Sequence, residues 1–256
     1  MKVKSPEEIT IMREGGKHLS SILRQVASAV RVGIETRELD TLALRLITET
    51  GDIPAFLHYK ADFSRKAYPA TLCVSINDEV VHGVPGKRKL ENGDIVGLDL
   101  GLQHRGLFVD MAVTVPVGKI SETDERLIQI TKEALRVGLA SARSGVRLGD
   151  VGVEIERVAE TAGFSVVREL GGHGVGHKIH EAPFVPHFGP RGKGEKLEVG
   201  QTICIEPMVN VGGPGVTFDQ DDGYTVRTAD GSRSAHYEVT LAVTDKGIDV
   251  LTPIFW

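Results

Sequence analysis

Hydrophobic residues recur at helical spacing in four segments of the chain. The first segment begins at Ser5-Pro6, which is typical of a helix N-cap followed by the first helical residue, and Glu8 completes a capping box. Apolar residues then follow on one face at Ile9, Met12, Leu19, Leu23 and Val26. This pattern predicts a helix at the N-terminal end of the chain.

Three further helices are predicted from caps and apolar spacing. One begins at about Thr36 and stops at Gly51, a second is capped by Ser121, and a third begins at Asp150 and ends at Gly163. Their apolar faces carry Leu39, Leu42, Leu46 and Ile47, then Leu127, Ile130, Ala134 and Val137, then Val151, Ile155 and Val158. The four helices therefore form two pairs, and strand-like sequence follows each pair.

Two aspartates interrupt the strand-like sequence after the first pair. Asp99 and Asp110 lie on either side of a short turn, inside apolar runs. If the turn centres on His104-Arg105, with Gly106 absorbing an awkward backbone angle, antiparallel pairing puts Asp99 directly opposite Asp110. Like charges in that position repel, and either a shared proton or a bound cation would relieve the repulsion.

Short internal echoes suggest that the chain repeats one plan. LENGDIVGLD at 90–99 is matched by LEVGQTICIE at 197–206, and an acidic residue ends both copies. RVGI at 31–34 and RSGV at 143–146 form a second echo, each ahead of the second helix of its pair. Two halves of similar length are implied, too few copies for a solenoid.

Three more residues could share a cation with the two aspartates. Glu206 ends an apolar run and precedes a proline, Glu238 lies on the more polar face of an alternating segment, and His173 lies in a glycine-rich stretch. The glycine spacing matches neither a phosphate-binding loop nor a helical zinc motif. A single acid at a strand end is usually only solvated, but four carboxylates and one imidazole suit two divalent ions. Because paired ions activate a shared water, metal-dependent hydrolysis is the predicted chemistry.

Composition excludes several other classes of function. The chain has 256 residues, 41% of them hydrophobic and 25% charged, which is enough for a full core. A net charge of −5 without a basic run argues against nucleic-acid and anionic-membrane partners. No apolar run suits a secretory signal or a membrane span, which predicts a cytoplasmic protein. Cys73 and Cys204 are predicted to be buried free thiols.

Five motifs in order resemble those of type I methionine aminopeptidases, members of the "pita-bread" metallopeptidase superfamily. They are SINDEVVHGVP at 75–85, the Asp99/Asp110 pair, GHGVG at 172–176 with His180-Glu181 after it, IEPMVN at 205–210 and SAHYE at 234–238. The resemblance extends over nearly the whole chain. It implies an α+β pita-bread fold in one catalytic domain, 1–256, with two pseudo-symmetric αα/β halves, about 1–118 and 119–256, around a curved antiparallel sheet.

The resemblance also implies a dinuclear metal site. Asp99 would bind one divalent ion, Asp110 and Glu238 would bridge both, and His173 and Glu206 would complete the second site. A water between the ions would attack the carbonyl of an N-terminal methionine, and Glu206 would handle its proton. Cobalt, manganese, iron and zinc all suit such ligands.

The same resemblance assigns residues to the substrate. His82 and His180 would contact the scissile amide and stabilise the tetrahedral intermediate, as imidazoles close to their ordinary pKa. Tyr68, Cys73 and Tyr224 would line the methionine pocket.

Two features of the chain depart from the usual family pattern near this pocket. The segment 62–66 is more charged than expected, and His177 occupies a loop position where arginine is more usual. Tyr224 also takes a position often held by tryptophan. None of these changes touches an expected metal ligand.

The expected function is removal of initiator methionine from nascent chains, most readily before a small second residue. A monomer is expected, and transient contact with the ribosome would suit this role. Two alternatives remain at this stage. One is a peptidase of the same superfamily specific for proline-containing substrates, although such enzymes generally carry an extra N-terminal domain. The other is a binding module that has lost catalysis, although such relatives usually lack some of the ligands.

Overall fold

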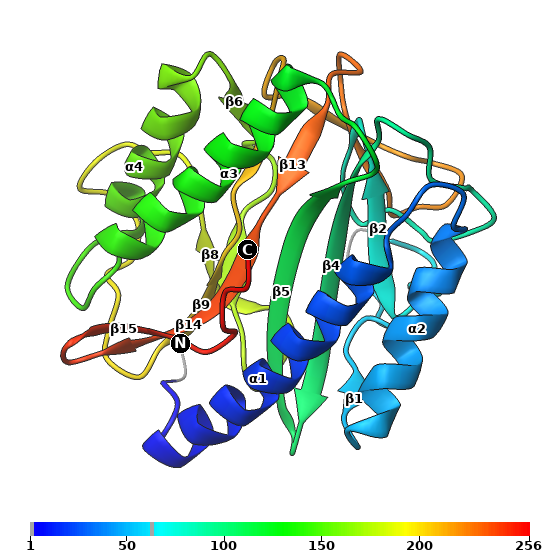
Figure 1. Cartoon of the computed structure of the whole chain (residues 1–256). Helices are drawn as coiled ribbons and strands as arrows, with labels where there is room; N and C mark the ends of the chain where they lie inside the picture. The colour runs from blue at the N-terminus through cyan, green and yellow to red at the C-terminus, as the bar shows by residue number, and fades with distance from the viewer. Residues whose placement is uncertain (1–2, 62–63) are drawn as a thin grey trace.

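The computed structural model describes residues 3–61 and 64–256 and shows helices packed across one side of a curved sheet (Figure 1). Figure 1 places one helix pair toward each end of the sheet, the first pair beside β4 and β5 and the second beside β13. The helices are α1 (Pro6–Ala29), α2 (Thr36–Glu49), α3 (Glu122–Ser141) and α4 (Leu148–Thr161).

Within the described ranges, nine antiparallel strands form the main sheet in the order β1-β4-β5-β14-β9-β7-β8, with β2 also paired to β4 and β15 to β14. They are β1 (Ile53–Pro54), β2 (Leu72–Ile76), β4 (Ile95–His104), β5 (Leu107–Pro116), β7 (Gly172–Gly174), β8 (Glu181–Val185), β9 (Thr202–Ile205), β14 (Glu238–Thr244) and β15 (Gly247–Val250). Two smaller sheets flank it. They contain β13 (Ser234–His236), β10 (Met208–Asn210) and β6 (Ser165–Val166), and β11 (Val216–Phe218), β12 (Val226–Thr228) and β3 (Glu79–Val81).

The capping box predicted for α1 is confirmed, and the cap predicted at Ser121 of α3 is part of a second capping box. Ser5 Oγ accepts from the Glu8 backbone N–H at 3.2 Å, and the Glu8 carboxylate accepts from the Ser5 N–H at 2.8 Å. Ser121 and Asp124 form the same reciprocal pair. Each cap satisfies amide groups that the helix itself leaves unpaired, which fixes where the helix begins.

The predicted start of the fourth helix was two residues too late. The helix begins at Leu148, and the N-cap residue Arg147 makes no capping hydrogen bond with its side chain. The Asp150 carboxylate instead accepts from the Gly192 backbone N–H at 2.7 Å. Asp150, which the sequence pattern predicted to begin the helix, therefore bonds to a distant segment instead.

The predicted register of the β4–β5 hairpin was also wrong. Its turn is Arg105-Gly106, where φ is 48° and 89°, as a two-residue type I′ turn requires. Asp99 therefore pairs with Ala112, and Asp110 pairs with Gly101. The two aspartates are diagonal neighbours on one face of the sheet instead of direct partners, and long side chains still reach each other across that diagonal.

The sequence echoes correspond to repeated hydrogen bonds. The Gly33 N–H donates to the Leu90 carbonyl at 2.7 Å, and the Gly145 N–H donates to the Leu197 carbonyl at 2.8 Å. Each contact ties the turn before the second helix of a pair to the segment leading into a strand of the main sheet. The boundary between halves near residue 118 stays a prediction.

The helices pack on the sheet face opposite the acidic residues. A β-carbon at Gly15 in α1 would meet the Leu102 and His104 side chains, and one at Gly138 in α3 would meet Ile205. Side chains alternate between faces along a strand, so Asp99, three positions from Leu102, points to the other face. One face of the sheet therefore builds the core with the helices, and the other is left to form a site.

Gly16 allows α1 to approach the C-terminal segment closely. An added β-carbon there would lie 2.0 Å from the Leu251 carbonyl oxygen, so the backbone would have to move. We expect Gly16→Ala to lower the free energy of unfolding by about 1–3 kcal/mol in denaturant titrations, although alanine favours helix. Ser21→Ala, on the exposed side of the same helix, should change it by less than about 0.5 kcal/mol. A gain in stability for Gly16→Ala would show that this contact is loose.

Candidate metal centre

Three strands of the main sheet bring carboxylates to one face. Asp99 on β4 pairs with Ala112 on β5, which in turn pairs with Glu238 on β14. Directly paired residues point to the same face, so Ala112 separates the two acids with only a methyl group. Asp110 lies two positions before Ala112 and points the same way. The strand register alone therefore gathers three acidic side chains around a small residue.

Glu206 and His173 close the group from the neighbouring strands. Glu206 directly follows β9, and His173 lies in β7. The His173 Nε2 atom is 3.3 Å from Glu206 Oε1, 3.9 Å from Glu238 Oε1 and 4.0 Å from Asp110 Oδ2. The five predicted ligands therefore converge on one small volume.

Burial makes this cluster costly to keep ionised. Asp110, Glu206 and Glu238 are 2%, 8% and 2% exposed. Burial raises the pKa of Asp110 to about 7, and it raises the pKa of Asp99, Glu206 and Glu238 well above the ordinary carboxyl value, with the neighbouring acids adding to the shift. A bound cation removes this penalty by stabilising the charged forms.

Several oxygens in the cluster fit the requirements of a metal ligand. Asp99 Oδ1, Glu206 Oε1 and Glu238 Oε1 are buried and lack a hydrogen-bond partner among the described residues. Buried polar atoms without partners are rare and call for an unseen ion or water. Oxygen ligands of this kind, together with one imidazole, suit divalent cations.

His173 is oriented to offer a lone pair to the same ion. Its Nδ1 lies 2.9 Å from the Gly174 carbonyl oxygen, which can only accept, so the ring hydrogen resides on Nδ1. Burial lowers the pKa of His173 to about 3, which keeps the ring neutral. Nε2 therefore presents its lone pair to the carboxylates, as metal-bound histidines held by a carbonyl do.

A cavity of about 310 Å³ opens above the cluster. Every residue assigned to the site from the sequence lines it: Asp99, Asp110, His173, Glu206, Glu238, His82, His180, Tyr68, Cys73 and Tyr224. Both cysteines, Cys73 and Cys204, are buried and free, as predicted. The structure thus brings the whole predicted set together, including residues more than 100 positions apart.

The two departures noted near the pocket have different outcomes. Asp62 and Phe63, in the charged segment 62–66, lie outside the described residues. His177 does not line the cavity, and its Nε2 instead lies 2.7 Å from Glu8 Oε1 on α1. His177 therefore ties the glycine-rich segment to the first helix.

The expectation of ordinary pKa values for His82 and His180 is not met. Burial lowers the pKa of each to about 4, and the nearby His180 adds to the effect on His82. Both rings are therefore neutral near pH 7. His82 also has φ of 61°, a left-handed backbone angle that costs energy in a residue other than glycine and is typical of functional positions.

Sequence reasoning missed two histidines that lie beside Glu206. His187 Nε2 accepts from the Glu206 backbone N–H at 3.2 Å, and His236 Nε2 lies 3.6 Å from Glu206 Oε2. Both imidazoles are buried, and burial lowers the pKa of each to about 3. His236 lay within a quoted motif, SAHYE, but nothing in the sequence around His187 indicated its contact.

Tyr59 was also missed, and it supports His180. The Tyr59 Oη atom lies 3.0 Å from His180 Nδ1, and the two rings meet edge to face with centroids 5.2 Å apart. Tyr59 precedes the charged segment and shares no motif with His180, so only the fold reveals the pair.

The apolar part of the cavity is built around two tyrosines. Tyr68 and Tyr224 meet edge to face at 5.0 Å between centroids. Tyr68 donates its hydroxyl to the Gly83 carbonyl at 2.9 Å, and Tyr224 donates to the Lys66 carbonyl at 2.6 Å. With the hydroxyls turned to the backbone, the rings offer mainly carbon to the cavity.

Comparison with known proteins decides the family. The family model for metallopeptidase family M24 matches residues 10–245. Methionine aminopeptidase 1 of Bacillus subtilis is 43% identical over 251 residues, covering 98% of each chain. The chain belongs to the methionine aminopeptidases of metallopeptidase family M24. Methionine aminopeptidase of Clostridium perfringens is 46% identical over 252 residues, again with 98% of each chain covered.

Solved structures of methionine aminopeptidases share the fold. The crystal structure from Thermotoga maritima matches with a TM-score of 0.94 and 39% identity, over 99% of this chain and all of that one. The prolidase from Pyrococcus furiosus matches with a TM-score of 0.78 but only 20% identity, over 66% of its length. The latter shares the fold alone. The predicted α+β pita-bread fold is confirmed.

Family membership and the ligand cluster together support binding of divalent metal at this site. Among the described helices, none combines the length and apolar character needed to cross a membrane.

Proposed function

We propose that the chain hydrolyses the first peptide bond of substrates that begin with methionine, and that it uses two divalent ions to do so. The observation that carries the proposal is the convergence of four carboxylates, three of them from buried residues, and a neutral imidazole beside a cavity of suitable size. Ions bound there would polarise the scissile carbonyl and lower the pKa of an attacking water.

The strand geometry supports a division of the ligands. Asp99 would hold one ion, His173 and Glu206 the other, and Asp110 and Glu238 would span both. Glu238 is 3.9 Å and Asp110 4.0 Å from the His173 ring nitrogen, while the Asp110 carboxyl also contacts Asp99. Asp110 thus touches the ligands of both ions. Cobalt, manganese, iron and zinc all remain compatible with this set.

Glu206 is the proposed proton acceptor and donor. Its backbone is held by His187 and its carboxyl faces His236 and His173. Neutral imidazoles on these sides leave the carboxyl free to exchange a proton without competing positive charge. The proton would pass from the attacking water to the departing amine.

His82 and His180 would stabilise the developing negative charge at the scissile carbonyl. If the Tyr59 hydroxyl donates to Nδ1, His180 keeps its hydrogen on Nε2, which is the nitrogen left to face the cavity. A neutral N–H that is already aimed and partly dehydrated stabilises an oxyanion without reorganisation.

The methionine side chain would occupy the apolar end of the cavity. Tyr68, Cys73 and Tyr224 line the cavity, and Phe56 and Met208 add further apolar surface. A thioether packs well against aromatic ring edges. Action on nascent chains, most readily before a small second residue, would place a monomeric protein in the cytoplasm, with transient access to the ribosome.

The direct test is methionine release from Met-Ala-Ser, compared with Leu-Ala-Ser and Ala-Pro-Ser, after reconstitution with each divalent metal in turn. We expect turnover of the methionine peptide and at least about a hundredfold lower kcat/KM for the leucine peptide, a difference of roughly 3 kcal/mol in transition-state binding. Preference for the Ala-Pro bond, or no turnover with cobalt, manganese, iron or zinc, would overturn the proposal.

Tyr59→Phe tests the positioning of His180. Losing one hydrogen bond to a neutral ring is worth about 0.5–1.5 kcal/mol, so kcat should fall about 2- to 10-fold with little change in KM. Tyr224→Phe, which removes a hydroxyl bound to backbone carbonyls, should act mainly on KM. If Tyr59→Phe changes KM and leaves kcat intact, Tyr59 contacts substrate and does not position the histidine.

A further inference from the structure

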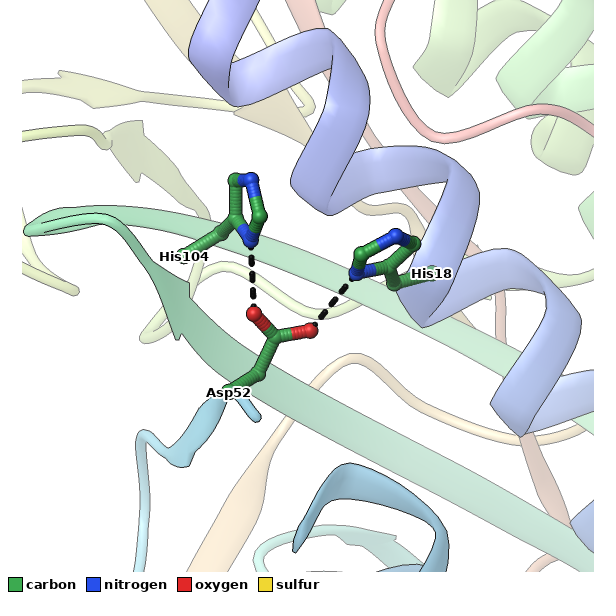
Figure 2. Close-up of side chains that lie close together, drawn as sticks. All are labelled: His18, Asp52 and His104. Atoms are coloured by element: carbon green, nitrogen blue, oxygen red, sulfur yellow. Dashed lines mark hydrogen bonds and ion pairs between the residues drawn. The ribbon is translucent and has the colours of Figure 1, made fainter. Parts of the chain in front are cut away.

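A second group of potential metal ligands lies apart from the cavity. His18 on α1, Asp52 just before β1 and His104 at the end of β4 come together in Figure 2, with both rings directed at one carboxylate. His18 Nδ1 is 2.8 Å from Asp52 Oδ2, and His104 Nδ1 is 2.6 Å from Asp52 Oδ1. None of the three lines the cavity, so the group belongs to a different part of the molecule.

The Asp52 carboxylate is buried among polar groups. Its side chain is 2% exposed, His104 Nδ1 faces Oδ1, and His18 Nδ1 and the Thr50 hydroxyl face Oδ2, where the hydroxyl donates at 2.7 Å. Each Nδ1 that faces this carboxylate must therefore carry either a hydrogen or a cation, since two lone pairs would repel.

The surroundings of His104 Nε2 favour a cation on Nδ1 of the same ring. If Nδ1 of the neutral ring carries the hydrogen, Nε2 is left with a lone pair, and this atom is buried without a hydrogen-bond partner among the described residues. Glu14 Oε2, another acceptor, lies 3.6 Å from it. A metal on Nδ1 moves the hydrogen to Nε2, where it points at Glu14. That is the carboxylate–histidine–metal arrangement found in most protein metal sites.

The charges around the group also favour a cation. Asp52 and Glu14 contribute two negative charges, and Arg105 contributes one positive charge at 3.1 Å from Glu14. These three groups leave one negative charge in excess beside the two imidazole rings. The His18 side chain is 38% exposed, which gives an ion a path from solvent.

We propose that His18, Asp52 and His104 form a separate binding site for Zn²⁺ or an ion of similar ligand preference. Two imidazole nitrogens and one carboxylate oxygen are a typical zinc ligand set, with water in the fourth position. One ligand atom from each residue already lies within 4.8 Å of the others. Zinc bonds of about 2.0–2.1 Å would place these atoms roughly 3.3 Å apart. The two histidine–Asp52 contacts, at 2.8 and 2.6 Å, would then lengthen by about half an ångström, while ligand atoms near the 4.8 Å limit would move closer together.

Such a site would stabilise the fold and would take no part in the reaction. It joins α1, the segment between α2 and β1, and the end of β4 beside the hairpin turn, which are far apart in the sequence. An ion that binds only the folded chain raises its stability. It would also add one ion per chain to the number held in the cavity.

Equilibrium dialysis with ZnCl₂ alone, followed by elemental analysis, tests the proposal on the full chain and on two variants. His18→Asn keeps an N–H that can donate to Asp52 but loses the imidazole ligand. His177→Ala is the matched control, because it removes another half-exposed histidine paired with a carboxylate, Glu8. We expect His18→Asn to bind one Zn²⁺ fewer than the parent chain and the control to bind the same number. Equal numbers of bound Zn²⁺ in all three proteins would overturn the proposal. The three side chains would then form a hydrogen-bonded group without a metal.

Histidine modification provides a second measurement that needs no variant. Diethyl pyrocarbonate should modify the half-exposed His18 in the metal-free chain, and saturating Zn²⁺ should suppress this at least about tenfold, as read by peptide mass spectrometry. His177 should be modified equally with and without zinc. Unchanged modification of His18 in zinc would contradict the site, even if His18→Asn failed to fold.

Discussion

Asp110→Asn will abolish methionine release, with kcat/KM falling at least about a thousandfold. The residue is proposed to touch both ions, and loss of several kcal/mol of transition-state stabilisation corresponds to a change of this size. Asparagine keeps an oxygen that can accept the Met111 N–H, as Asp110 Oδ1 does at 3.0 Å. The substitution therefore removes charge without removing shape. The measurement is steady-state turnover of Met-Ala-Ser, with metal content determined on the same sample.

Stability distinguishes loss of metal from loss of fold in this variant. Asp110→Asn takes one charge out of a buried acidic cluster, so the metal-free variant should have a Tm at least as high as the metal-free parent. Asp124→Asn is the matched control: Asp124 is also buried, at 4% exposed, but it caps α3 away from the cavity. It should lower Tm and leave kcat/KM of the folded protein within about twofold. Activity retained in Asp110→Asn would rule out Asp110 as a shared ligand.

Removal of metal by a chelator will abolish activity and make stability strongly dependent on pH. In the metal-free chain the pKa of Asp110 is raised to about 7, and the pKa values of Asp99, Glu206 and Glu238 are raised well above their unfolded values. A carboxyl with a raised pKa binds more protons when folded than when unfolded, so stability falls as the pH rises above about 4. Between pH 5 and pH 8 we expect a loss of a few kcal/mol, or on the order of 10 °C in Tm.

Metal should remove this slope. An ion holds the same carboxylates in their ionised form, and its affinity rises with pH because protons are displaced on binding. The control is therefore the same pH series at saturating Mn²⁺, where Tm should vary little between pH 6 and pH 8. Activity should return when the metal is restored. Identical slopes with and without metal would mean that the acidic cluster is not where the ion binds.

Local sequence signals were enough to place most of the fold. Ser5 and Ser121 fix the starts of two helices because their hydroxyls accept hydrogen bonds from amides three residues away, a contact that depends only on neighbours. Asp150 misled the same reasoning because its partner, Gly192, lies in another segment. The hairpin register failed for a similar reason: two turns differing by one residue were both compatible with Gly106, and only the backbone angles distinguish them.

The site could be predicted as a set of residues but not as an arrangement. Motif order and spacing indicated Asp99, Asp110 and Glu238, and strand pairing then places Ala112 between two of them. His187 could not be predicted, because its contact with Glu206 depends on how a loop folds over β9. The His18, Asp52 and His104 group was hidden for the same reason, since each residue comes from a different element.

The central claim is that five residues beside the cavity hold two divalent ions, with Asp110 and Glu238 shared between them. Crystals of the protein grown with Mn²⁺ would test it most directly through an anomalous difference map. The account predicts two peaks roughly 3.5–4 Å apart at the cavity floor, both within bonding distance of Asp110 and Glu238. A single peak at full occupancy, or peaks that none of these carboxylates contacts, would contradict it.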